Sequence, residues 1–234
     1  MEKFLSSLWS GWGIQLLRGL VVTIEISVGG YIAGLLIGGV VAGVKLGGPK
    51  WAVKIANGYS TICRAVPEIL LILIIFYAGQ SGLNALLDLI GVGTVGISGF
   101  FAAIAVLGIV QGAYASEILR GAVLAIPRGQ IEAAKAFGMH GVILFGRTIL
   151  PLMVPYAFAG LSNLWMAIIK DSVLVSVVGY NELTFTGTQA AGATKFYVQY
   201  YLLLGAIYYV VTQFSNVFIN IFEASFLRWT PRSE

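Results

Sequence analysis

Charged side chains that interrupt long apolar stretches are the first candidates for chemistry in this 234-residue chain. Ionisable groups inside a membrane segment are costly, and they usually mark the path of a solute or an ion. Five such residues stand out, Glu25, Glu68, Glu117, Lys170 and Asp171, and the last four are candidates for a substrate pathway. Two of them also have an opposite charge at helical spacing, since Arg64 precedes Glu68 by four residues and Arg120 follows Glu117 by three. For both acids a structural ion pair is therefore the plainer interpretation.

The sequence lacks the residue sets that perform covalent or metal chemistry. Cys63 is the only cysteine and His140 the only histidine, which excludes an internal disulfide, a paired-cysteine zinc site and a histidine-rich metal site. No phosphate-binding P-loop, HExxH or GxSxG motif occurs. We therefore expect no catalytic residue, no metal site and no cofactor bound by this chain itself.

The elements that must position the charged residues are membrane helices. Hydrophobic residues make up 58% of the chain, charged residues make up only 10%, and the mean hydropathy is +0.90. A soluble domain has about a quarter of its residues charged, so this composition excludes one. We predict an all-α polytopic membrane protein with a single transmembrane domain over residues 1–234.

Five uncharged stretches are long enough to cross a bilayer, which takes about 20 helical residues. They are Ile26–Val44, Ile69–Leu87, Val95–Ser116, Thr148–Ile169 and Phe196–Phe222. We expect the first to extend backward through Glu25 and Arg18, and the second to begin nearer Ile55. The segment Ser172–Asn181 is too short to span, which predicts a re-entrant segment or a loop.

Glycine recurs at four-residue spacing in the first span. Gly30, Gly34 and Gly38 form two overlapping GxxxG units, and Gly39 and Gly43 form a third. Small residues at this spacing let another helix approach closely. Packing within this chain is favoured over a role at a subunit interface.

The distribution of Lys and Arg predicts which side of the membrane each loop faces, because basic loops stay in the cytoplasm. Nine basic residues lie in the first loop, the third loop and the tail, against two in the second and fourth loops. The nine are Lys45, Lys50, Lys54, Arg120, Arg128, Lys135, Arg147, Arg228 and Arg232, and the two are Lys170 and Lys195. The N-terminus is therefore expected outside and the C-terminus in the cytoplasm.

The long internal loop, about residues 120–150, is the most informative segment. Pro127 suits the first turn of a helix, Gln130–Phe137 contains good helix formers, and Gly138 suits a left-handed cap after the helix. A second short helix is expected over Val142–Arg147. The small, largely apolar surface of the first helix would fit a groove in a partner. Alternatively, the two helices rest on the membrane or under their own bundle, and the spacing leaves both readings open.

This loop resembles the EAA loop of permease subunits in bacterial ABC importers. The similarity is carried by Glu132, Ala133 and Ala134, then Gly138, and later Leu150 and Pro151. More specifically, the chain resembles the polar amino acid branch, the histidine, glutamine and opine-type permeases. Further matches extend over nearly the whole chain: Arg64, Pro67, Glu68, Tyr114, Glu117, Arg120, Gly121, Lys170, Asp171, Ser172, Ser215, Asn216 and Glu223. Thr148 in place of the usual Ile, and Ala65 and Val66 in place of Gly-Thr, depart from the pattern.

The resemblance implies a type I ABC importer transmembrane domain that forms half of a translocation pathway in a bacterial inner membrane. The implied partners are a second permease subunit, identical or a paralogue, two ATPase subunits that bind ATP and Mg, and an external solute-binding protein. Residues implied to dock to the ATPase are Gly129, Gln130, Ile131, Glu132, Ala133, Ala134, Lys135, Phe137 and Gly138. The implied substrate is a polar or basic amino acid or an opine, and an unpaired Glu68 facing the cavity would attract a cationic one.

Two other classes of membrane protein compete with this interpretation. An ion-coupled secondary transporter would need paired repeats and acids at broken helices, and it would leave the EAA-like loop unexplained. An intramembrane serine protease would need a histidine at membrane depth, whereas His140 lies outside every expected span. Both alternatives are weaker than the importer.

Overall fold

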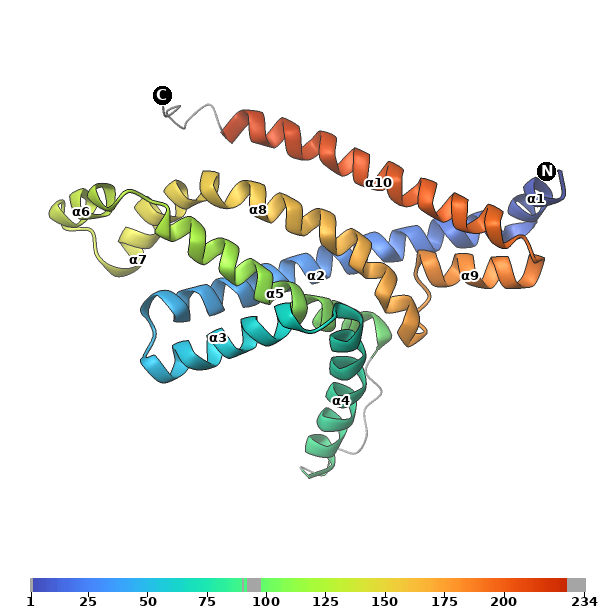
Figure 1. Ribbon diagram of the computed structural model, residues 1–234, viewed down its shortest axis with the longest axis horizontal. Helices are drawn as coiled ribbons and strands as arrows, with labels where there is room; N and C mark the ends of the chain where they lie inside the picture. The colour runs from blue at the N-terminus through green and yellow to red at the C-terminus, as the bar shows by residue number, and fades with distance from the viewer. Residues whose placement is uncertain (1, 90, 92–97, 227–234) are drawn as a thin grey trace.

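The computed structural model describes residues 2–89, 91 and 98–226, and in these residues all regular structure is helical. Figure 1 shows long helices lying roughly side by side, with α4 turned away from the others. The order is α1 (Glu2–Ser7), η1 (Leu8–Trp12), α2 (Gly13–Gly47), α3 (Lys50–Ala65), α4 (Glu68–Leu89), α5 (Gly99–Leu124), α6 (Arg128–Ala136), α7 (Gly141–Leu144), η2 (Phe145–Ile149), α8 (Leu150–Asp171), η3 (Ser172–Val178), α9 (Leu183–Thr194) and α10 (Tyr197–Phe226).

Five helical segments of the described chain are long and apolar enough to cross a membrane, which confirms the predicted number of spans. They cover Gly13–Gly47, Glu68–Leu89, Gly99–Leu124, Gly141–Val178 and Tyr197–Glu223. Each overlaps one predicted stretch, although the predicted start of the third span, at residues 95–97, lies outside the described residues. The first span does extend backward through Glu25 and Arg18, as expected.

The second span begins later than predicted, because a break at residues 66–67 separates α3 from α4. Val66 is extended, with φ −92° and ψ 138°. Proline restricts the preceding residue to this region and itself lacks an N–H, so Pro67 ends the helix that begins at Lys50. The residues from Ile55 to Ala65 therefore belong to a separate helix, α3, that forms a hairpin with α2 (Figure 1).

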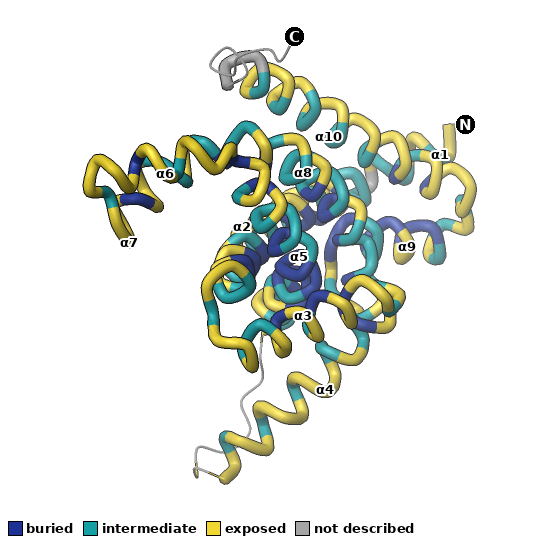
Figure 2. Tube along the Cα trace, turned by 60° about the vertical axis from the view of Figure 1, so that its left-hand side comes forward, coloured by how far each residue is buried: buried dark blue, intermediate teal, exposed yellow. Residues whose placement is uncertain are grey.

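The packing centre of the molecule is the contact between α2 and α5. Gly30, Gly34 and Gly38 are buried on α2, and a Cβ atom added at Gly38 would lie 2.5 Å from the Cβ atom of Ala115. Figure 2 shows the buried residues concentrated on α5 and its neighbours, whereas α4 and α10 are largely exposed. Packing of Gly30, Gly34 and Gly38 within the chain is thus confirmed. Gly39 and Gly43, the third predicted GxxxG unit, face open space, so the prediction of packing within the chain was wrong for this unit.

Two other predictions need correction. The second short helix of the internal loop does not end at Arg147, because α7 and η2 continue directly into α8. Pro151 cannot donate a backbone hydrogen bond, and the chain passes the preceding turn in the wider π-helical form. Ser172–Val178, within the stretch predicted as a re-entrant segment or a loop, is a 3-10 helix, η3, that continues the fourth span. A further helix, α9, follows it in the region that was predicted to be the fourth loop.

Candidate functional site

The turn after α6 is fixed by two backbone hydrogen bonds. The N–H of Gly138 donates to the carbonyl of Lys135 at 2.9 Å, and the N–H of Met139 donates to the carbonyl of Ala134 at 3.1 Å. This pair of bonds is a Schellman motif, which requires positive φ at the residue after the helix, and Gly138 has φ +81°. The predicted left-handed cap at Gly138 is confirmed. The helix begins at Arg128, so Pro127 immediately precedes the first turn in which it was predicted to lie.

One face of α6 is attached to the membrane helices. Ile131 packs against a buried cluster that includes Ala122, Ile126 and Met153, and Ala134 is also buried. These contacts connect α6 to the ends of α5 and α8. A movement of α6 would therefore be transmitted to two spans.

The other face of the loop carries apolar side chains that contact little of this chain. Phe137 is 85% exposed and Val142 is 86% exposed. Glu132, Ala133 and Lys135 are exposed too, as are Gly129 and Gln130 at the start of the helix. In Figure 1, α6 lies at the far end of the molecule, beyond the end of α8. Ile131 and Ala134 therefore pack under the bundle, as one of the two readings of the loop expected, whereas Phe137 is exposed.

A polar cluster between spans brings together two of the predicted pathway residues. The Nε2 atom of Gln111 on α5 donates to Asp171 Oδ2 at 2.6 Å, at the end of α8. The side chain of Glu68, the first residue of α4, is close enough to Asp171 and Tyr114 to interact electrostatically with both. The Gln111 side chain is buried, and its Oε1 atom has no partner among the described residues. Two acids and an unsatisfied carbonyl oxygen thus meet between three helices.

A second cluster surrounds Glu117, six residues after Gln111 on α5. Its Oε1 atom lies 2.7 Å from Lys45 Nζ and its Oε2 atom lies 2.9 Å from Arg120. Lys45 is almost fully buried and also donates to Ser60 and Ser116. The predicted pair of Glu117 with Arg120 is confirmed, and the cluster ties the ends of α2, α3 and α5 together.

The predicted pair of Arg64 with Glu68 is wrong. Because Pro67 separates the two helices, the four-residue spacing does not place these side chains on one helical face. Arg64 instead lies 3.7 Å from Glu117. Lys170, the fourth predicted pathway residue, is exposed beside Asp171.

A buried acid that the sequence analysis did not single out joins α2, α9 and α10. Glu182 is fully buried, and its carboxylate accepts hydrogen bonds from Thr23, Tyr208 and the N–H of Phe185 at 3.1, 3.1 and 2.7 Å. Burial raises the pKa of Glu182, although these hydrogen bonds act in the opposite direction. In the sequence, Glu182 is a single acid between two short apolar segments, which was the signal available for it. Because this region was predicted to be a loop, no role was predicted for Glu182.

Comparison with known proteins gives a consistent result. The chain is 37% identical over 225 residues to the histidine/lysine/arginine/ornithine transport system permease protein HisQ of Escherichia coli (strain K12), covering 96% of this chain and 98% of that protein. It is 34% identical over 223 residues to the octopine transport system permease protein OccQ of Rhizobium radiobacter, covering 95% and 94%.

A solved structure described as an amino acid ABC transporter with histidines has the same fold, with a TM-score of 0.78 and 27% identity. The match covers 95% of this chain and 98% of that one. The model of the family described as "binding-protein-dependent transport system inner membrane component" matches residues 30–228. The expected resemblance and inner-membrane location are therefore confirmed, and the chain belongs to the family of binding-protein-dependent transport system inner membrane components.

Proposed function

We propose that this chain, acting as one transmembrane domain, is the permease subunit of an ATP-driven importer for amino acids or opines. The names of the HisQ and OccQ relatives support this substrate class. The chain would form half of the translocation pathway with a second permease subunit, identical or a paralogue. An external solute-binding protein would deliver the substrate, and two ATPase subunits would bind ATP and Mg.

The observation that carries the proposal is the two-sided geometry of α6. Ile131 attaches the helix to α5 and α8, while Phe137 is 85% exposed beside Glu132 and Ala133. A partner that binds residues 129–138 would remove this apolar surface from water and would move two spans when it moved. We place this loop and the C-terminus in the cytoplasm and the N-terminus outside, as the basic loops indicate.

Co-purification tests the docking surface. The transporter is purified through this chain from native membrane, as wild type and as Glu132→Lys, and the accompanying proteins are identified. Glu132 is exposed, so its substitution should leave the fold intact while placing the wrong charge in the interface. We expect an ATPase subunit with the wild type and at least a tenfold loss with the variant.

Asp88→Lys is the matched control, because Asp88 is an exposed acid outside the loop, at the end of α4. It should retain the ATPase. Retention with Glu132→Lys, or solute uptake by the reconstituted chain without ATP, would overturn the proposal.

The substrate pathway is proposed to pass the cluster of Glu68 and Asp171. Two acids beside the unsatisfied Oε1 atom of Gln111 offer acceptors to the cationic group of a basic amino acid. Glu117 and Lys170 would flank this route, since Glu117 follows Gln111 by six residues on α5 and Lys170 is adjacent to Asp171.

Uptake by reconstituted transporter distinguishes this route from a merely structural cluster. We expect Glu68→Gln to reduce uptake of basic amino acids or cationic opines at least fivefold more than uptake of neutral substrates. Equal reduction of both classes would indicate a structural role, and unchanged uptake of basic substrates would also contradict the proposal.

A further inference from the structure

Three positive charges meet a single negative charge in the cluster around Glu117. Lys45, Arg64 and Arg120 approach its carboxylate to 2.7, 3.7 and 2.9 Å. In the described part of the chain, none of the three forms an ion pair with any other acid. The cluster therefore keeps an excess of positive charge, which attracts an anionic group.

Arg64 is the member of this cluster that still has free donors. Its Nε atom donates to the carbonyl of Ser60 at 3.2 Å, but its Nη2 atom is too far from Glu117 for a hydrogen bond. Arg120 instead donates twice to Glu117, and Lys45 is almost fully buried. The Arg64 side chain is 45% exposed, and a guanidinium group offers its N–H groups as a planar fork that matches a carboxylate.

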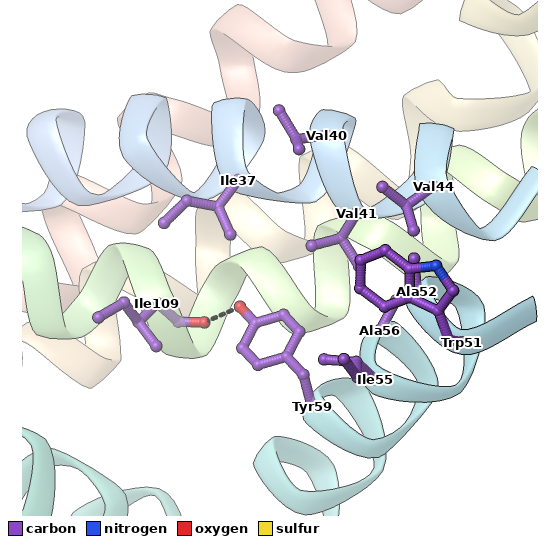
Figure 3. A pocket seen from close by; sticks show the side chains of 10 residues that line it. All are labelled: Ile37, Val40, Val41, Val44, Trp51, Ala52, Ile55, Ala56, Tyr59 and Ile109. Carbon is purple, nitrogen blue, oxygen red and sulfur yellow. Dashed lines mark hydrogen bonds between the residues drawn. The ribbon is translucent and has the colours of Figure 1, made fainter. Parts of the chain in front are cut away.

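The position of Arg64 is fixed by the packing of α3 on α5. The Tyr59 hydroxyl donates to the carbonyl of Ile109, and Figure 3 shows this side chain reaching from α3 to α5. One residue later, the Ser60 hydroxyl lies 3.1 Å from that of Ser116. Arg64 follows Ser60 by one helical turn, so its guanidinium group is held beside α5.

Tyr114 lies between this positive region and the two acids of the other polar cluster. It interacts electrostatically with Arg64 and also with Glu68 and Asp171. The α5 residues that belong to the two clusters are six positions apart, which is about 9 Å along the helix. A region of excess positive charge thus lies beside a pair of acids, at a separation comparable to the length of an extended basic amino acid.

We propose that Arg64 binds the carboxylate group of the transported amino acid or opine. This inference rests on the proposed function, in which Glu68 and Asp171 accept the cationic group of the same molecule. Each end of the substrate would then meet the opposite charge. An exposed charge beside membrane spans is costly unless it faces a water-filled cavity, which supports a position of Arg64 on the solute route.

Ligand binding by the purified transporter tests the proposal. The complex is isolated through this chain in detergent and titrated without the external solute-binding protein, which would otherwise select the ligand. The probes are L-arginine, octopine and agmatine, which is arginine without its carboxylate group. We expect the wild type to bind L-arginine or octopine at least tenfold more tightly than agmatine.

Substitutions of Arg64 should remove this preference. Arg64→Gln should weaken binding of the carboxylate-containing probe at least tenfold and change that of agmatine less than twofold. Arg64→Lys keeps the charge but not the planar fork, so its preference should be intermediate. Arg18→Gln is the matched control, because Arg18 is also exposed and forms no ion pair among the described residues. It should keep the wild-type preference.

Three results would overturn the role of Arg64. The wild type could show no preference for a carboxylate, or Arg64→Gln could weaken binding of all probes equally, which would indicate a structural role. An unchanged preference in Arg64→Gln would contradict the proposal too, and this result is expected if the guanidinium group binds a lipid phosphate instead.

The uptake assay described above separates this inference from the proposed function. ATP-dependent uptake of a basic amino acid or opine by the wild type, together with any of these three results, would contradict only the role of Arg64. Absence of ATP-dependent uptake of every amino acid and opine would contradict the proposed function itself.

Discussion

Glu117 and Glu182 are both acids between packed helices, but their surroundings differ. Three basic side chains lie within 4 Å of Glu117: Lys45, Arg64 and Arg120. Glu182 has no such ion pair among the described residues and accepts hydrogen bonds from neutral donors instead. The comparison shows that one residue type can join three helices either by charge or by hydrogen bonding alone, with different consequences for mutation and pH.

The largest effect is expected at Glu117, because its loss leaves Lys45 buried without a counter-charge. Removing one partner of a buried ion pair costs about 3–5 kcal/mol. We expect Glu117→Gln to lower stability by about this amount, measured by denaturant unfolding of the protein in detergent micelles.

Two further variants sharpen this prediction. Arg120 is 38% exposed on its side chain, so Arg120→Gln should cost at most about 1 kcal/mol. Adding Lys45→Met to Glu117→Gln should restore part of the loss. If Glu117→Gln lowers the free energy of unfolding no more than Arg120→Gln does, the burial of Lys45 does not determine the stability of this cluster.

An intermediate effect is expected at Glu182. Glu182→Ala would leave the Thr23 and Tyr208 hydroxyls and the Phe185 N–H without their acceptor, at about 1–3 kcal/mol for each group that finds no water. Glu182→Gln keeps one carbonyl oxygen and should cost about 1 kcal/mol, in contrast to Glu117→Gln. Equal losses for the two Gln variants in the same unfolding assay would remove the distinction between the sites.

The smallest effect is a pH dependence that belongs to Glu182. Burial raises its pKa in the folded state above the unfolded value of about 4.3, so the folded state binds more protons between the two values. Stability should be highest below the unfolded pKa, fall as the pH rises through the folded pKa, and then level off. Thermal unfolding in nanodiscs at a series of pH values measures this change.

Glu182→Gln has no titrating group at this position and provides the reference curve. The stability of the wild type minus the stability of Glu182→Gln should fall with rising pH. A difference that rises with pH would mean that hydrogen bonding outweighs burial at Glu182.

Local sequence chemistry determined much of this protein. Span number follows from the length of uncharged stretches, since a bilayer core requires about 20 helical residues. The turn after α6 follows from Gly138, because only glycine adopts positive φ without strain. The close approach of another helix to α2 follows from Gly30, Gly34 and Gly38, although only the structure identifies that helix as α5. Each of these features depends on residues that are neighbours along the chain.

Helical spacing predicted the pair of Glu117 with Arg120, but the tertiary structure alone decided the other contacts between distant polar groups. Lys45 and Glu117 are 72 residues apart, and Thr23 and Glu182 are 159 residues apart, so no helical spacing relates them. Spacing also gave a wrong partner for Arg64, because Pro67 redirects the chain before Glu68. A polar group between helices bonds to whatever the packing of distant segments brings within reach, and only the folded arrangement of α2, α3, α5, α9 and α10 specifies those neighbours.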